Sequence, residues 1–125
     1  MTYEPNDSAV LDSMSSAEII HRCAEMSGIE YRSQGDGEHR YFECKGDSRF
    51  PDTWIQYHPF FKGDQAFQLI EKLGLIILGN SVTCYRSLPY SPAMVSDPDL
   101  KKAICKCVAL THYRINRGRH DSTSG

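Results

Sequence analysis

The feature that most constrains this chain is an amphipathic helical pattern in residues 97–113. Apolar residues recur there three and four positions apart, which is the spacing of one buried helix face; they are Leu100, Ala103, Ile104, Cys107, Val108 and Leu110. Asp97 is the expected N-cap and Pro98 the first helical residue. We expect the helix to end between Tyr113 and Asn116. A helix with one apolar face must pack that face against another layer.

Two further helices are expected earlier in the chain, at about residues 15–27 and 64–73. Each is bounded by residues typical of helix ends, namely Ser15, Glu18 and Gly28 for the first and Asp64 and Gly74 for the second. Both have apolar positions at helical spacing, so both need a layer to pack against.

Short strand-like segments separate the helices, at residues 29–32, 39–45, 53–58, 75–78 and 81–86. Residues 75–78, with the sequence LIIL, are apolar on both faces, which predicts a central strand covered on both sides. Residues 87–96 contain two prolines and are expected to be a loop. These elements predict an α+β fold of the α-β-α layered sandwich type, with a mostly antiparallel sheet of about five strands and three helices.

At 125 residues the chain is long enough for one domain, which we place at residues 13–116. A loose polar lead-in (1–12) precedes it and a flexible polar tail (117–125) follows it. The net charge of −2 argues against strong nonspecific nucleic-acid binding. No run of about 18 apolar residues and no secretory signal pattern is present, so we expect no membrane partner and a cytoplasmic location.

Five cysteines are expected to be reduced and to pack as small hydrophobic residues. Zinc is disfavoured, because Cys105 and Cys107 would point to different faces of a helix. We expect no metal, no cofactor and no catalytic residue. The main enzymatic alternative is a reactive thiol at Cys105 or Cys107, beside Lys102 and Lys106.

Aromatic residues crowd the stretch 54–61, just ahead of the second helix. We interpret it as a strand-to-helix joint, in which Pro59 ends the strand and Phe60 or Phe61 packs at the helix entry. The alternative is a stacking platform for a base or a peptide, formed by Trp54, Tyr57 and His58.

Two groups of residues are candidates for binding a partner. Loop aromatics and one arginine are the expected anchors of a protein-binding surface, namely Tyr57, Phe60, Tyr85, Arg86 and Tyr90. A basic set near the C-terminus is a candidate patch for phosphates or an acidic partner, namely Lys101, Lys102, Lys106, Arg114, Arg117 and Arg119. The alternative for the basic set is a solvated helix face with a solubilising tail.

Two segments resemble phage ABA-sandwich proteins and the related NinX-like phage accessory proteins. The segment YHPFFKGDQAFQLIEKLG (57–74) is similar to their Pro-x-x-x-x-Asp-x-Ala-aromatic segment through Pro59, Ala66, Phe67, Glu71, Lys72 and Leu73. The segment DLKKAICKCVALTHY (99–113) is similar to their closing helix through Ala103, Ile104, Cys105 and Leu110, with Cys107 where the family usually has alanine. The resemblance covers roughly residues 54–113. It implies an α-β-α layered fold, a phage or prophage origin, a bacterial host cytoplasm and no established catalytic residues.

Two functions follow from this combination. The first is a non-enzymatic phage accessory protein that binds and inhibits or modulates a host or defence component, as an anti-CRISPR-type inhibitor does. The second is an oligomeric module, a homodimer or larger, that sequesters a nucleotide, with the rings of Trp54 and Tyr57 on the base and Arg86 on the phosphate.

Overall fold

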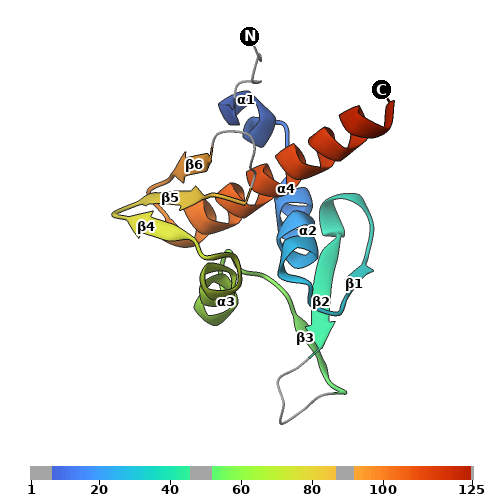
Figure 1. Ribbon diagram of the computed structural model, residues 1–125. Helices are drawn as coiled ribbons and strands as arrows, with labels where there is room; N and C mark the ends of the chain where they lie inside the picture. Colours follow the sequence, from blue (N-terminus) through green and yellow to red (C-terminus); the bar gives the residue numbers. More distant parts are fainter. Residues whose placement is uncertain (1–6, 46–51, 87–91, 125) are drawn as a thin grey trace.

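The structure is a computed structural model that describes residues 7–45, 52–86 and 92–124, with all side chains in those ranges except those of residues 7, 8, 38 and 117–124. Within them the chain is an α+β fold with two three-stranded antiparallel sheets (Figure 1). The helices are α1 (Asp7–Asp12), α2 (Ser16–Ser27), the short 3-10 helix η1 (Gly37–His39), α3 (Gly63–Leu73) and α4 (Leu100–Ser124). The strands are β1 (Tyr31–Gln34), β2 (Tyr41–Lys45), β3 (Trp54–Gln56), β4 (Ile76–Leu78), β5 (Ser81–Cys84) and β6 (Ala93–Ser96).

Helix α4 is the centre of the molecule. It packs against sheet B (β4-β5-β6) through β5 and β6, and against α1, α2 and α3. Helix α2 in turn packs against β2 of sheet A (β1-β2-β3). The layers therefore run from sheet B through the helices to sheet A (Figure 1). The predicted α-β-α order is wrong, because the helices lie between the sheets rather than outside one.

The side chains of α4 explain this arrangement. A helix that is covered on several sides must be apolar on several sides. The residues of its middle turns that are buried are Ala103, Ile104, Cys105, Cys107, Val108, Ala109, Leu110 and Thr111. The sequence pattern predicted only one buried face and left out Cys105, Ala109 and Thr111.

The single sheet of about five strands is also corrected to two separate sheets. Residues 93–96, expected to be part of a loop, form strand β6, whose Val95 pairs with Val82 of β5. Strand β4 was expected to be central but is an edge strand that pairs only with β5 among the described residues. Its Ile76 and Leu78 are 46% and 77% exposed, so LIIL is not covered on both faces.

Local signals placed some helix ends correctly. The Ser15 hydroxyl accepts from the Glu18 backbone N–H at 3.1 Å, which confirms the predicted N-cap of α2. Gly28 and Gly74 adopt left-handed φ values of 69° and 64°, as predicted for helix stops. The predicted N-cap at Asp64 is wrong, because α3 begins one residue earlier.

The start of α4 is shifted by two residues from the prediction. Asp99, not Asp97, caps the helix: its Oδ1 accepts from the backbone N–H of Lys101 at 3.0 Å. Asp97 instead accepts from the Asp99 backbone N–H at 2.9 Å. A helix (α1) occupies residues 7–12 of the expected lead-in, and the backbone of α4 continues to Ser124 through most of the expected tail.

Candidate functional site

The strand-to-helix joint is built around buried rings. Tyr57 and Phe60 are only 3% and 6% exposed, so their rings pack in the core and do not form a partner-binding surface. Burial raises the pKa of the Tyr57 hydroxyl well above its ordinary value. Ser27 lies near that hydroxyl and has a smaller, opposite effect on its pKa, but the two do not meet hydrogen-bond geometry. The expectation that these two aromatic residues are exposed anchors is therefore wrong.

Gln65 connects the two sides of the joint. Its Oε1 accepts from the His58 backbone N–H at 2.7 Å, and its Nε2 donates to the Gln56 carbonyl at 2.8 Å. Gln65 is 4% exposed. The sequence contains a signal for this role. Gln65 lies four positions before Leu69 and so falls on the apolar face of α3, where a polar side chain indicates a buried hydrogen bond.

Tyr85 and Arg86 follow β5. Tyr85 is about half exposed. Arg86 donates through Nε to the Leu73 carbonyl at 3.4 Å and through Nη2 to the Lys72 carbonyl at 3.2 Å. This arginine therefore satisfies free carbonyls at the C-terminal end of α3. Tyr90 lies outside the described residues.

The basic set does not form one patch among the described side chains. Lys106 pairs with Asp97 at 2.6 Å, and Arg114 is 4% exposed. Lys102 is exposed and Lys101 is partly exposed. The side chains of Arg117 and Arg119 lie outside the description. Arg114 is therefore too buried to belong to a surface patch, and a phosphate-binding patch of the other five residues stays a prediction.

The five cysteines are all buried. Burial raises the pKa of the Cys23 and Cys44 thiols, and it raises the pKa of Cys107 to about 12. A raised pKa keeps a thiol protonated, and the thiolate is the nucleophile. This counts against Cys107 as the reactive thiol of an enzyme.

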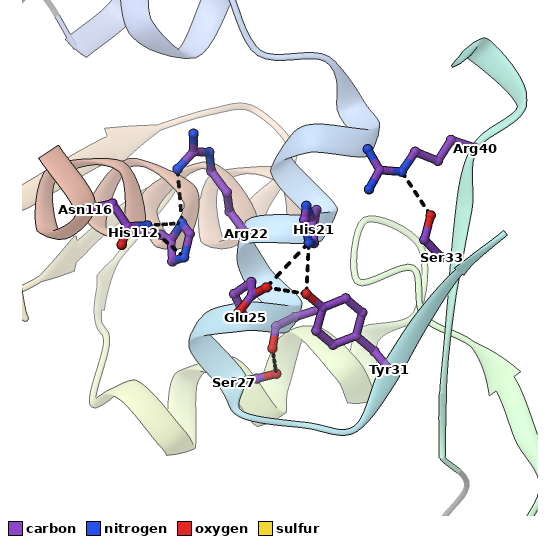
Figure 2. A network of polar contacts seen from close by, with 10 residues as sticks. His21, Arg22, Glu25, Ser27, Tyr31, Ser33, Arg40, His112 and Asn116 are labelled. Atoms are coloured by element: carbon purple, nitrogen blue, oxygen red, sulfur yellow. Dashed lines mark hydrogen bonds and ion pairs between the residues drawn. The ribbon is translucent and has the colours of Figure 1, made fainter. Parts of the chain in front are cut away.

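A polar cluster ties α2 to β1 (Figure 2). The Tyr31 hydroxyl donates to Glu25, so His21 Nε2 must donate to the Tyr31 oxygen, 2.8 Å away. The His21 ring also stacks on Phe42 with 5.4 Å between ring centres. Burial, followed by the Glu25 hydrogen bond, raises the pKa of Tyr31 to about 12. The Tyr31 hydroxyl thus stays protonated and acts as a structural tie rather than as a general base.

A second polar link joins α2 to α4. Arg22 binds Glu18 at 3.2 Å and donates to His112 Nδ1 at 3.0 Å (Figure 2). Asn116 lies one turn further along α4 and contacts the same imidazole. These contacts fix the crossing of the two helices.

Among the described residues, the outer face of sheet B carries no charged side chain. Residues on alternate positions of its strands face away from α4; they are Ile76, Leu78, Ser81, Thr83, Met94 and Ser96. Met94 is 59% exposed, in addition to the exposed Ile76 and Leu78 of β4. The opposite face of the sheet carries buried Val82 and Val95. Sheet B therefore presents an outer face of three large apolar side chains and three hydroxyl side chains.

The outer face of sheet A is chemically different. The Trp54 ring lies under two cations, with Arg32 Cζ 4.2 Å and Lys45 Nζ 4.7 Å from its centre. Arg32 also binds Glu43 at 2.9 Å. Because both cations cover Trp54, this ring is not the open stacking platform that the aromatic stretch suggested.

No protein-family model matches this chain, and no curated protein and no solved structure is significantly similar to it. The resemblance to phage ABA-sandwich proteins therefore stays a prediction. Among the described residues, no group of three or more His, Cys, Asp or Glu side chains is arranged to hold a metal ion. Within the same part of the chain, no helix has the length and hydropathy needed to cross a bilayer.

Proposed function

We propose that this protein is a non-enzymatic phage or prophage accessory protein that binds a host or defence-system protein and inhibits or modulates it. The observation that supports a binding role is the outer face of sheet B. Three large apolar side chains, Ile76, Leu78 and Met94, stand exposed on one uncharged sheet face. Several large apolar side chains exposed on one face of a small protein favour an interaction site there.

The chemistry of this face determines the kind of partner. It has no charge to match an acidic or basic surface, so affinity comes from burying apolar area around a few anchors. Leu78, the most exposed of the three, and Tyr85, which directly follows β5, are the anchors that we expect to contribute most. Of the predicted aromatic residues that the structure describes, Tyr85 is the one that lies on the surface.

The test compares capture by matched variants. Tagged protein is used to pull partners from a bacterial lysate, and a stoichiometric partner is identified by mass spectrometry. Leu78→Ser with Met94→Ser is expected to lose that partner. Phe67→Ser is the control, because Phe67 is a 57% exposed apolar residue on α3 and outside sheet B. Capture that survives the double substitution, or that Phe67→Ser abolishes equally, would contradict a role of this face.

The alternative function, an oligomeric nucleotide-sequestering module, is not supported with the residues first chosen for it. Tyr57 is buried, Trp54 is covered by cations, and Arg86 binds the end of α3. Light scattering of the purified protein tests the homodimer separately. A small ligand would have to bind at a site that does not use these three residues.

A further inference from the structure

Strand β4 forms one edge of sheet B. Figure 1 shows β4 at the outside of the sheet, with β5 between it and β6. The turn Gly79-Asn80 joins β4 to β5, so Leu78 and Ser81 close a two-residue hairpin and exchange their backbone hydrogen bonds. Hydrogen-bonded and non-hydrogen-bonded pairs alternate along an antiparallel ladder. The backbone N–H and C=O of Ile77 therefore point away from β5.

The other side of β5 agrees with this alternation. The Asp97 N–H donates to the Asn80 carbonyl at 3.3 Å, and two residues further along β5, Val82 pairs with Val95 of β6. The backbone groups of Val82 thus point toward β6 and away from Ile77, which lies opposite it on β4. None of the described residues forms a hydrogen bond with the outward N–H and C=O of Ile77.

The edges of sheet A are protected, whereas the edge at β4 is not. The carbonyl of Gln56 on β3 accepts from Gln65 Nε2 at 2.8 Å, and β1 carries the charged Arg32. Strand β4 has the sequence IIL, with no charged residue and no proline. Natural edge strands use charges, prolines or a covering group to prevent pairing with another chain. The unprotected edge of β4 favours pairing with a further strand.

The charge pattern around β4 indicates which strand fits. Residues 73–85 contain no charged side chain, and the flanking charges are Lys72 and Arg86. A charged partner strand would find no ion pair there. A two-fold axis, in contrast, places a segment against the same segment of another copy, where any charge near the axis would meet a like charge. An uncharged edge strand therefore suits a second copy of this chain.

We propose that β4 pairs antiparallel with β4 of a second copy of this chain, around a two-fold axis beside Ile77. Each Ile77 donates its N–H to the carbonyl of the other Ile77, so both outward backbone groups are satisfied. Ile76 then lies opposite Leu78 of the second copy in a non-hydrogen-bonded pair, where side chains are closest. The two three-stranded sheets become one sheet of six strands.

This pairing is compatible with the proposed binding face and extends it. The exposed side chains of Ile76 and Leu78 stay on the outer face, next to those of the second copy. The dimer does not require the host partner, so either proposal can fail while the other holds. A three-residue pairing is a small contact, and we expect a dissociation constant in the micromolar to millimolar range.

Sedimentation velocity of the purified full chain, from micromolar to millimolar concentration, tests the dimer. The unaltered protein should show a reversible monomer–dimer equilibrium. Ile76→Lys with Leu78→Lys places lysine opposite lysine twice across the axis and is expected to weaken dimerisation by about 10- to 100-fold. Ile76→Glu with Leu78→Glu should weaken it similarly. An equal mixture of the two variants should dimerise again, because each lysine then lies opposite a glutamate.

Met94→Lys is the matched control. Met94 is 59% exposed on the same outer face, but it lies on β6, two strands away from the proposed axis. The substitution should change the dissociation constant of the dimer by less than about twofold. If Met94→Lys weakens dimerisation as much as the double lysine variant does, the outer faces pack against each other and edge pairing is wrong.

Amide hydrogen exchange of the unaltered protein gives a readout that does not depend on a variant folding. The Ile77 N–H should gain protection as the protein concentration rises. The Leu78 N–H, which pairs with Ser81 in monomer and dimer alike, should not change. A monomer at every concentration, an Ile77 amide that gains no protection, or a mixture of charged variants that stays monomeric would overturn the proposal.

Discussion

At the scale of single residues, Gln65 is the side chain on which the strand-to-helix joint depends most. Replacing it by alanine removes two hydrogen bonds, to His58 and Gln56, in a nearly buried place. Because the freed backbone groups lose their partner, we expect Gln65→Ala to lower the free energy of unfolding by about 2–4 kcal/mol. Urea denaturation followed by circular dichroism measures this.

Gln68 provides the control for that prediction. It is exposed and lies one turn along the same helix, so Gln68→Ala should change the free energy of unfolding by less than about 0.5 kcal/mol. Similar losses for both variants would show that helix propensity, not the bridge across the joint, sets the effect.

Gly35 is the residue at which the turn before η1 admits no side chain. Its φ is +77°, and a Cβ there would stand 2.5 Å from the His39 carbonyl oxygen. Gly35→Ala is therefore expected to cost about 2–3 kcal/mol in thermal or urea unfolding, combining backbone strain with a backbone clash.

Gly37 separates the two contributions. It also has a positive φ, of +53°, but a Cβ there meets nothing within 4 Å. Gly37→Ala should cost only the conformational strain, about 1 kcal/mol. If the two variants lose equal stability, the clash at Gly35 is relieved by movement of the turn.

At the scale of elements, the start of α4 depends on the ion pair between Asp97 and Lys106. The Lys106 hydrogen bond, followed by the Asp99 backbone N–H, lowers the pKa of Asp97 below its ordinary value of 3.8. A carboxylate with a lowered folded-state pKa stabilises the fold above its unfolded pKa, and this contribution is lost as the pH falls through the folded pKa. We expect Asp97→Asn to lose about 1 kcal/mol at pH 7 and progressively less below about pH 4, measured by urea unfolding at each pH.

Asp52 is the natural comparison for this pH dependence, because it is an exposed carboxylate outside the helices. Asp52→Asn should have nearly the same free energy of unfolding as the unaltered protein across the same pH range. If the loss in free energy of unfolding caused by Asp97→Asn stays constant down to pH 2, the contribution of Asp97 is not ionic.

Three helix ends were located correctly by sequence reasoning. Ser15, Gly28 and Gly74 act through hydrogen bonds and backbone angles within a few residues of themselves. Asp97 was misassigned because two aspartates two positions apart both suit an N-cap, and the contact with Lys106 nine residues later decides between them.

At the scale of the whole molecule, the cysteines are distributed through the core. All five thiols are buried, and those of Cys23, Cys44 and Cys107 have raised pKa values. We expect a thiol reagent such as DTNB to label the native protein about a thousandfold more slowly than the urea-unfolded protein, since labelling must wait for opening. The absorbance of the thionitrobenzoate released by DTNB, followed over time, measures the labelling rate. Rapid labelling of one thiol in the native protein would indicate a reactive cysteine.

The amino-acid sequence by itself determined the α+β class, the caps of α2, the glycine stops and the strand-to-helix joint. These are local features, because each is satisfied by groups near it along the chain. Tertiary structure alone decided that the helices lie between two sheets, that α4 is buried on several sides, and that Tyr57 and Phe60 point inward. Burial depends on which distant elements pack together. A pattern of apolar positions predicts which face of an element is buried, but it does not predict which other element covers that face.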